Sequence, residues 1–305
     1  MASPDIAMLP DISVFFGVSI DELFALSDDT RMERIQNMLW DVRFLDRGEC
    51  DAAREFLLQK ATREPGNGRP HELLADLELH VAKGHREKAA EYALEAMARD
   101  PGLMDAHGSL VEAMSGATVD WCYVNHYVLI DQYKDYIEAH PDCVSAYLYL
   151  MDQLVDDSRL AEAAEYCEKL AAFYNGYQVL LYRGIIAWWD GQRERAFAIW
   201  QQMEQEFPEK WQVYHNIGDY LVRSGRYEEA KTYYRKALDK QSAPRYVDPC
   251  EALAQVCVIQ GDIPGAIEAL EEELALCEIE WHFTTGESAD YVRREIARLK
   301  CRLKD

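Results

Sequence analysis

The chain contains 305 residues, of which 49% are apolar, 29% charged and 11% aromatic. This composition allows a sizeable core and excludes an intrinsically disordered protein. With 55 acidic against 32 basic residues the net charge is −23, so a bare contact with DNA or an anionic membrane surface is repelled. Only 16 glycines and 10 prolines are present, too few turn formers for a barrel or sandwich of many short strands. A mostly helical fold is therefore expected.

Targeting signals and cysteine pairs are also missing from the sequence. No apolar run reaches the roughly 20 residues of a membrane span, and the N-terminus MASPDIAMLP lacks the basic start and apolar centre of a signal peptide. We therefore expect a cytoplasmic protein without a membrane partner. The eight cysteines include no C-x-x-C pair, which favours reduced, mostly buried thiols over disulfides or metal ligands.

Residues 3–26, SPDIAMLPDISVFFGVSIDELFAL, show the pattern of two short helices. Gly17 is predicted to end the first helix, and Ser19 with Glu22 matches a capping box that would begin the second. This string resembles the last part of the helix-turn-helix domain of the lambda-repressor and Cro type, found in the XRE family of bacterial regulators. The resemblance covers about the final third of such a domain.

The helices that contact DNA in that family would precede Met1, so we expect no direct DNA binding by this chain. Whether the chain was cut inside the domain or truncated naturally stays open. A simpler interpretation is that the apolar side chains of this segment cover the end of the array that follows. We combine the two and expect residues 1–30 to be a helix-turn-helix remnant acting as an N-terminal cap.

From Met32 to Ile279, apolar residues at helical spacing recur with a period of roughly 34 residues. The clearest unit, Val213 to Leu238, has two apolar stretches separated by Ser224-Gly225-Arg226, the pattern of a helical hairpin. This unit resembles the tetratricopeptide repeat. The matching positions are Tyr214, Ile217, Gly218, Leu221, Gly225, Tyr227, Ala230, Tyr234 and Ala237.

About seven such units can be placed on residues 31–282, with turns expected at Gly48, Gly84, Gly191, Gly225 and Gly261. The third unit departs from the period, because its second helix arrives about six residues late and predicts an insertion within Ser115 to His126. The resemblance implies an all-α fold, a right-handed α-α superhelix of about seven hairpins. Since a solenoid exposes apolar surface at each end, residues 283–305 are predicted to form a C-terminal capping helix.

The sequence carries no nucleotide-binding or zinc-hydrolase motif, so we expect neither an enzyme nor a cofactor. His80 and His85 are the histidines nearest to a pair. Because they flank the expected turn at Gly84, we interpret them as surface or packing residues and predict no metal site.

In the family that the repeats resemble, the first helix of each hairpin lines a concave groove. Aromatic anchors with a few polar groups suit a peptide or helix in such a groove. The predicted groove residues are Tyr149, Asp152, Asp156, Tyr182, Trp188, Trp189, Asn216, Asp219, Arg223 and Gln255. Asn216 matches a position where peptide-binding members hold the ligand backbone. For the tryptophan pair an alternative stays open, because neighbouring helix positions point about 100° apart and one indole can pack in the core.

The two resemblances together imply a non-enzymatic protein- or peptide-binding module, the sensing part of an XRE-like transcriptional regulator. The alternative is a scaffold protein that organises a complex unrelated to transcription. The expected partner in either case is a peptide or protein in the concave groove, apolar and carrying Lys or Arg. A homodimer is left open.

Overall fold

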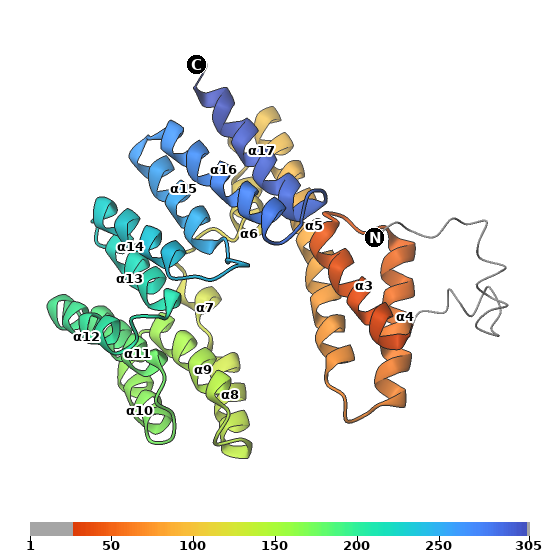
Figure 1. Cartoon of the computed structure of the whole chain (residues 1–305). Helices are drawn as coiled ribbons and strands as arrows, with labels where there is room; N and C mark the ends of the chain where they lie inside the picture. Colours follow the sequence, from red (N-terminus) through yellow and green to blue (C-terminus); the bar gives the residue numbers. More distant parts are fainter. Residues whose placement is uncertain (1–26, 304–305) are drawn as a thin grey trace, which may run out of the picture. The chain divides into compact units, whose positions relative to one another are not determined.

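The computed structural model describes residues 27–303 (Figure 1). All the regular elements in this part of the chain are α-helices, so the predicted all-α class is confirmed. The expected N-terminal helices of residues 3–26 lie outside the described residues. The chain divides into two compact units: one runs to Ala117 and includes Thr285–Ser288, and the other comprises Thr118–Thr284 and the residues from Ala289 onward. The division falls within the stretch where the sequence predicts an insertion.

The first unit consists of α3 (Asp28–Asp41), α4 (Arg47–Arg63), α5 (Arg69–Arg99) and α6 (Met104–Ala113). Helix α4 begins with a capping box, in which Asp46 accepts a hydrogen bond from the Glu49 backbone and Glu49 reaches back to the Asp46 backbone. Phe56 and Leu57 of α4 pack with Leu73 of α5 in the core of this unit. Helices α3 and α6 pack against α5.

The sequence predicts a hairpin with a turn at Gly84, and this prediction is wrong. Helix α5 is 31 residues long, and Gly84 lies in its interior with no break in the helix. Good helix formers such as Lys83 and Arg86 surround this glycine, and one interior glycine costs a helix only about 1 kcal/mol. Gly48 likewise lies in the first turn of α4 rather than in the connection before it.

The third predicted unit is not a hairpin either. Its expected first helix is α6, which packs on α5 in the first unit. Its expected second helix is α8 (Tyr127–Ala139), which packs on α9 (Val144–Asp156) in the second unit. The late arrival of α8 in the sequence therefore reflects a break in the repeat order and not a longer loop inside one hairpin.

The second unit contains the regular hairpins. After α7 (Trp121–Val124), α8 and α9 come the remaining helices of the unit: α10 (Leu160–Ala171), α11 (Tyr177–Trp189), α12 (Arg193–Glu206), α13 (Trp211–Arg223), α14 (Tyr227–Asp239), α15 (Asp248–Gln260), α16 (Ile263–Ile279) and α17 (Glu287–Arg302). Helices α9 to α16 pair in succession, and each pair packs on the next, as in a helical solenoid (Figure 1).

Glycines end the first helix in three of these four hairpins. Gly191, Gly225 and Gly261 have φ angles of 80°, 73° and 76°, the left-handed conformation that closes a helix and that glycine adopts without strain. The α9–α10 turn uses Ser158 in the same conformation, with φ 60°. The predicted turns at the three glycines are therefore confirmed.

Small residues let the paired helices approach closely. A Cβ added at Gly218 of α13 would lie 2.6 Å from Cε1 of Tyr234 on α14, and one at Gly184 of α11 would lie 2.0 Å from Nε1 of Trp200 on α12. Each glycine therefore accepts a large ring from the second helix of its own hairpin.

The C-terminal helix closes the core of the second unit. One face of α17 buries Ala289, Val292, Ile296 and Leu299, and the last three belong to the same apolar cluster as residues of α15 and α16. Helix α17 lies within residues 283–305, where the sequence predicts a C-terminal helix.

Candidate functional site

The first helices of the hairpins in the second unit each have two distinct sides. On α13, Val213, Ile217 and Leu221 are buried against the neighbouring helices. The polar residues of α13 fall three and four positions apart, at Gln212, His215, Asn216 and Asp219. This spacing places them on one side of the helix.

A hydrogen bond joins the first helices of two successive hairpins. The hydroxyl of Tyr182 on α11 lies 2.6 Å from Oδ1 of Asp152 on α9 and 3.1 Å from the Leu148 carbonyl oxygen. Burial raises the pKa of the Asp152 carboxyl, and the bond from Tyr182 partly offsets that rise. The charged form of Asp152 is therefore less favoured than in a free aspartate, although the residue is exposed to solvent.

A second tyrosine–aspartate contact lies within the next hairpin. The Tyr234 hydroxyl on α14 donates to Oδ1 of Asp219 on α13 at 2.7 Å. Burial and the Asp219 carboxylate both raise the pKa of Tyr234. The hydrogen bond from Tyr234 on α14 thus fixes the position of the Asp219 carboxylate on α13.

Tyr220 lies near both of these contacts. Burial raises the pKa of Tyr220 to about 12, and among the smaller influences are Arg223, a hydrogen bond with Trp189, and the carboxylates of Asp219 and Asp152. Side chains of α9, α11 and α13 therefore converge around this phenol. We call the surface formed by Asp152, Trp189, Asp219 and Tyr220 the α9–α13 face.

Within the described chain, neither carboxylate of the α9–α13 face has a lysine or arginine partner. Among the described residues, no Lys or Arg forms an ion pair with Asp152 or Asp219; His215 lies 3.8 Å from Asp219. The guanidinium carbon of Arg223 lies 5.9 Å from the Tyr220 ring centroid. The face thus presents two carboxylates beside aromatic surface, a combination that attracts a cationic side chain.

The two adjacent tryptophans have opposite surroundings. Trp189 is 48% exposed, whereas Trp188 is 7% exposed. The Trp188 ring packs edge-on to Phe197 and Tyr220, with centroid separations of 5.9 and 5.4 Å. Trp188 is therefore a core residue and not the ligand anchor that the sequence predicts. Tyr182, also predicted as an anchor, is buried and offers only its hydrogen-bonding hydroxyl to the carboxylate.

The remaining predicted residues are more scattered. Tyr149 is exposed one turn before Asp152 on α9 and stacks on Tyr133 of α8 at 6.1 Å. Asp156 ends α9 beside His126. Asn216 donates its side-chain amide to the Gln212 carbonyl of its own helix at 2.7 Å, so that N–H group is engaged within the helix.

Gln255 belongs to a separate hollow of about 310 Å³ between α15, α16 and α17. Its wall is apolar at Val258, Ile259 and Tyr291, and the Gln255 amide donates to Glu251 at 3.2 Å. The sequence pattern places Gln255 on the groove-lining side of α15. The contribution of α17 to this hollow could not be predicted, because α17 lies outside the repeats.

Sequence reasoning missed an aromatic row along the connections of the second unit. Trp211 stacks on Tyr246 at 5.6 Å, Tyr246 meets Trp281 at 5.7 Å, and Trp281 stacks on Phe283 at 6.2 Å. Trp281 also donates its indole N–H to the Arg245 carbonyl at 2.6 Å. Three of these residues lie in loops, where a helical period gives no information.

Metal sites and membrane-spanning helices were not found in the part of the chain that the structure describes. No group of His, Cys, Asp or Glu residues is arranged to hold a metal ion there. Within residues 27–303, no helix combines the length and apolar character needed to cross a membrane.

Comparison with known proteins identifies one repeat directly. Residues 212–239, which cover α13 and α14, match the family model of the tetratricopeptide repeat. No curated protein matches the chain.

Several solved structures resemble the chain at low sequence identity. A tetratricopeptide repeat protein from Parabacteroides merdae ATCC 43184 is 13% identical, with 87% of this chain and 98% of that chain covered and a TM-score of 0.44. The type IV pilus biogenesis factor PilW is 14% identical, with 81% and 99% covered and a TM-score of 0.38. YrrB, described as a tetratricopeptide repeat protein with an unusual peptide-binding site, is 15% identical, with 68% and 100% covered and a TM-score of 0.34.

Proposed function

We propose that this protein is a non-enzymatic binding module that holds a basic, partly apolar peptide or helix of a partner protein on the α9–α13 face. The observation that carries the proposal is that, among the described residues, neither Asp152 nor Asp219 forms an ion pair with a lysine or arginine, while Trp189 and Tyr220 lie beside them. Two carboxylates without a Lys or Arg partner in the described chain are complementary to a Lys or Arg of a ligand. The exposed indole of Trp189 offers the apolar contact that gives such a complex its residence time.

The tetratricopeptide repeat at residues 212–239 supports the same proposal, because α13 within it supplies Asp219 and Tyr220. YrrB, which the chain resembles in part, is described as having a peptide-binding site. The protein could act as a scaffold through this surface alone, with the bound partner forming part of a larger complex.

A sensing role in an XRE-like transcriptional regulator is the narrower version of the proposal. It rests on the resemblance of the amino-acid sequence of residues 3–26 to a helix-turn-helix domain, and these residues lie outside the described part of the chain. In that version, the ligand on the α9–α13 face would be the signal that the regulator detects.

The proposal can be tested with a peptide array that varies charge and apolar content independently, probed with the full chain. We expect the retained peptides to combine Lys or Arg with aromatic or aliphatic residues. Trp189→Ala should then weaken binding while leaving the far-ultraviolet circular dichroism unchanged, because the indole is largely exposed. Tyr92→Ala serves as the control, since Tyr92 is another exposed aromatic residue, 70% accessible, on α5 of the first unit. Retention of acidic peptides by this face, or equal effects of the two variants, would contradict the proposal.

A further inference from the structure

A second surface, in the first unit, has the opposite charge. A pocket of about 460 Å³ lies between α4, α5 and the segment that joins α3 to α4. Basic side chains dominate its wall, with Asp51 as the acidic lining residue; they are Arg43, Arg47, Arg54, His80, His85 and Lys88. Such a concentration of positive charge is unexpected in a chain with a net charge of −23.

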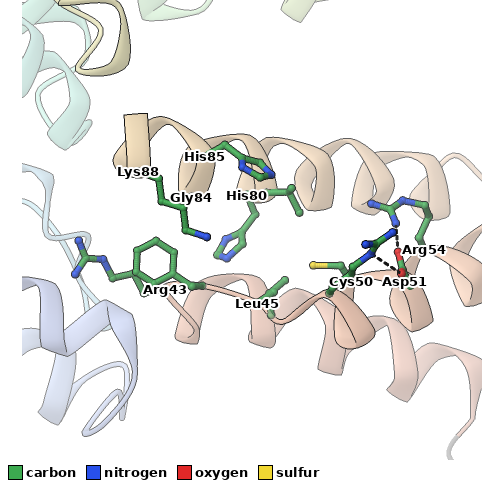
Figure 2. Close-up of a pocket in the computed structure, with 12 residues that line it drawn as sticks. Arg43, Leu45, Cys50, Asp51, Arg54, His80, Gly84, His85 and Lys88 are labelled. Atoms are coloured by element: carbon green, nitrogen blue, oxygen red, sulfur yellow. Dashed lines mark hydrogen bonds and ion pairs between the residues drawn. The ribbon is translucent and has the colours of Figure 1, made fainter. Parts of the chain in front are cut away.

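The basic groups are gathered at two ends of the pocket. Figure 2 shows Arg43 and Lys88 at one end and Arg54 beside Asp51 at the other. Arg47 joins the second end, since its guanidinium lies 3.8 Å from the Asp51 carboxylate. Between the ends, the wall includes apolar groups such as Leu45.

Two of the arginines are held by acids outside the pocket wall. Arg43 pairs with Glu87 at 2.7 Å, and Arg54 with Glu78 at 2.7 Å and also with Asp51 of the pocket wall at 2.8 Å. These pairs orient the guanidinium groups without filling the pocket. Lys88 forms no ion pair with any residue between 27 and 303.

His80 lines the middle of the pocket. Nε2 of His80 is buried and has no hydrogen-bond partner within the described chain. Figure 2 places the His80 ring between α5 and the segment around Leu45.

The spacing of the two ends sets the length of a ligand. Lys88 at one end and Glu78, the partner of Arg54 at the other, are ten positions apart on α5, which corresponds to about 15 Å along the helix axis. An extended peptide rises about 3.3 Å per residue, so four to five residues bridge this distance. A small inorganic anion would reach only one end and would leave the apolar centre without a contact.

We propose that this pocket binds an extended internal segment of an acidic partner peptide, with two carboxylates that flank an apolar residue. One carboxylate contacts Lys88 and Arg43, the apolar residue lies against Leu45 and Val81, and the other carboxylate contacts Arg47 and Arg54. The site is separate from the α9–α13 face and selects the opposite charge. The protein can therefore engage two chemically different segments.

The test uses fluorescence anisotropy of a labelled peptide in which two glutamates flank Ala-Leu-Ala, with both peptide termini blocked. The full chain should bind this peptide saturably, and binding should weaken as salt rises, because the contacts are near the surface. The double variant R47E/K88E should lose at least about ten-fold in affinity. Both positions are exposed, so the variant is expected to fold normally.

The matched controls separate the site from net charge and from simple anions. Lys210→Glu changes an exposed lysine of the second unit and should leave affinity unchanged within two-fold. A peptide with lysine in place of both glutamates should not bind. The proposal is overturned if the acidic peptide does not bind saturably, if R47E/K88E binds as well as the wild type, or if phosphate or glutarate at millimolar concentration displaces the peptide completely.

Discussion

The Tyr182 hydroxyl on α11 and Oδ1 of Asp152 on α9 are 2.6 Å apart, so one hydrogen bond links two successive hairpins and holds a carboxylate at the α9–α13 face. Because the bond favours the charged form of Asp152 whereas burial disfavours it, Tyr182→Phe should raise the pKa of Asp152 further. It should also destabilise the second unit by about 1 kcal/mol. Carbon-13 NMR of the aspartate side chains during a pH titration measures the first effect. Tyr166→Phe is the control, since the Tyr166 hydroxyl donates to no residue in the described chain.

Ligand binding should depend on pH in the direction set by Asp152. A basic ligand interacts with the charged carboxylate, so its affinity should be full above the raised pKa of Asp152 and should fall as the pH is lowered through that pKa. Asp152→Asn should bind more weakly at neutral pH and should lose this dependence. Calorimetric titrations of the best array peptide at several pH values test both statements. An affinity that increases on acidification would contradict them.

Glu273 in the second unit is a buried acid with a raised pKa. It is 5% exposed on α16, its Oε2 has no hydrogen-bond partner in the described chain, and burial together with Glu251 and Asp248 raises its pKa to about 7. The unfolded state releases this proton near pH 4.5, whereas the folded state keeps it to about pH 7. The contribution of Glu273 to stability is therefore complete below pH 4.5 and is lost as the pH rises towards 7.

Glu273→Gln should remove the loss of folding stability between pH 4.5 and 7, because glutamine stays neutral at every pH. Relative to the wild type, the variant should gain up to about 3 kcal/mol at pH 8 and little at pH 4.5. Denaturant midpoints measured across this pH range give the difference. Glu268→Gln, an exposed change on the same helix, should show no such trend. A Glu273→Gln gain that is equal at pH 4.5 and pH 8 would show that the buried charge is not the cause.

Close packing at the hairpin glycine makes a steric prediction. A Cβ at Gly218 would lie 2.6 Å from the Tyr234 ring, so Gly218→Ala should destabilise the second unit by about 1–3 kcal/mol. Gly108→Ala is the matched control: Gly108 is helical in α6, and no atom lies within 4 Å of its added Cβ. That change should be neutral or stabilise by up to about 1 kcal/mol. Thermal unfolding of both variants shows whether the two substitutions change stability in opposite directions.

The repeat pattern could predict the hairpins of the second unit because each repeated position has one physical role. Gly225 adopts a left-handed turn, Gly218 accepts the Tyr234 ring, and Ala230 is fully buried. The same pattern failed at Gly84, since a glycine among helix formers has no local feature that distinguishes a turn from a continuous helix. The continuous α5 became evident only in the structure.

The candidate site was predictable in outline but not in detail. Period alone placed Asp152, Asp219 and Trp189 on first helices, and all three contribute to the α9–α13 face. Period could not decide which member of Trp188 and Trp189 is buried, because that depends on how far the next hairpin covers α11. The basic pocket of the first unit combines α4, α5 and a connecting segment, and no sequence motif spans such a combination.

The central claim is that Asp152 of the α9–α13 face contacts a basic residue of the ligand. A double-mutant cycle tests this most directly: Asp152→Asn in the protein is combined with replacement of the key ligand lysine by norleucine, and all four affinities are measured at neutral pH and moderate salt. The account predicts a favourable coupling free energy of at least about 1 kcal/mol between the two charged groups. A coupling of zero, with each single change weakening binding independently, would contradict it.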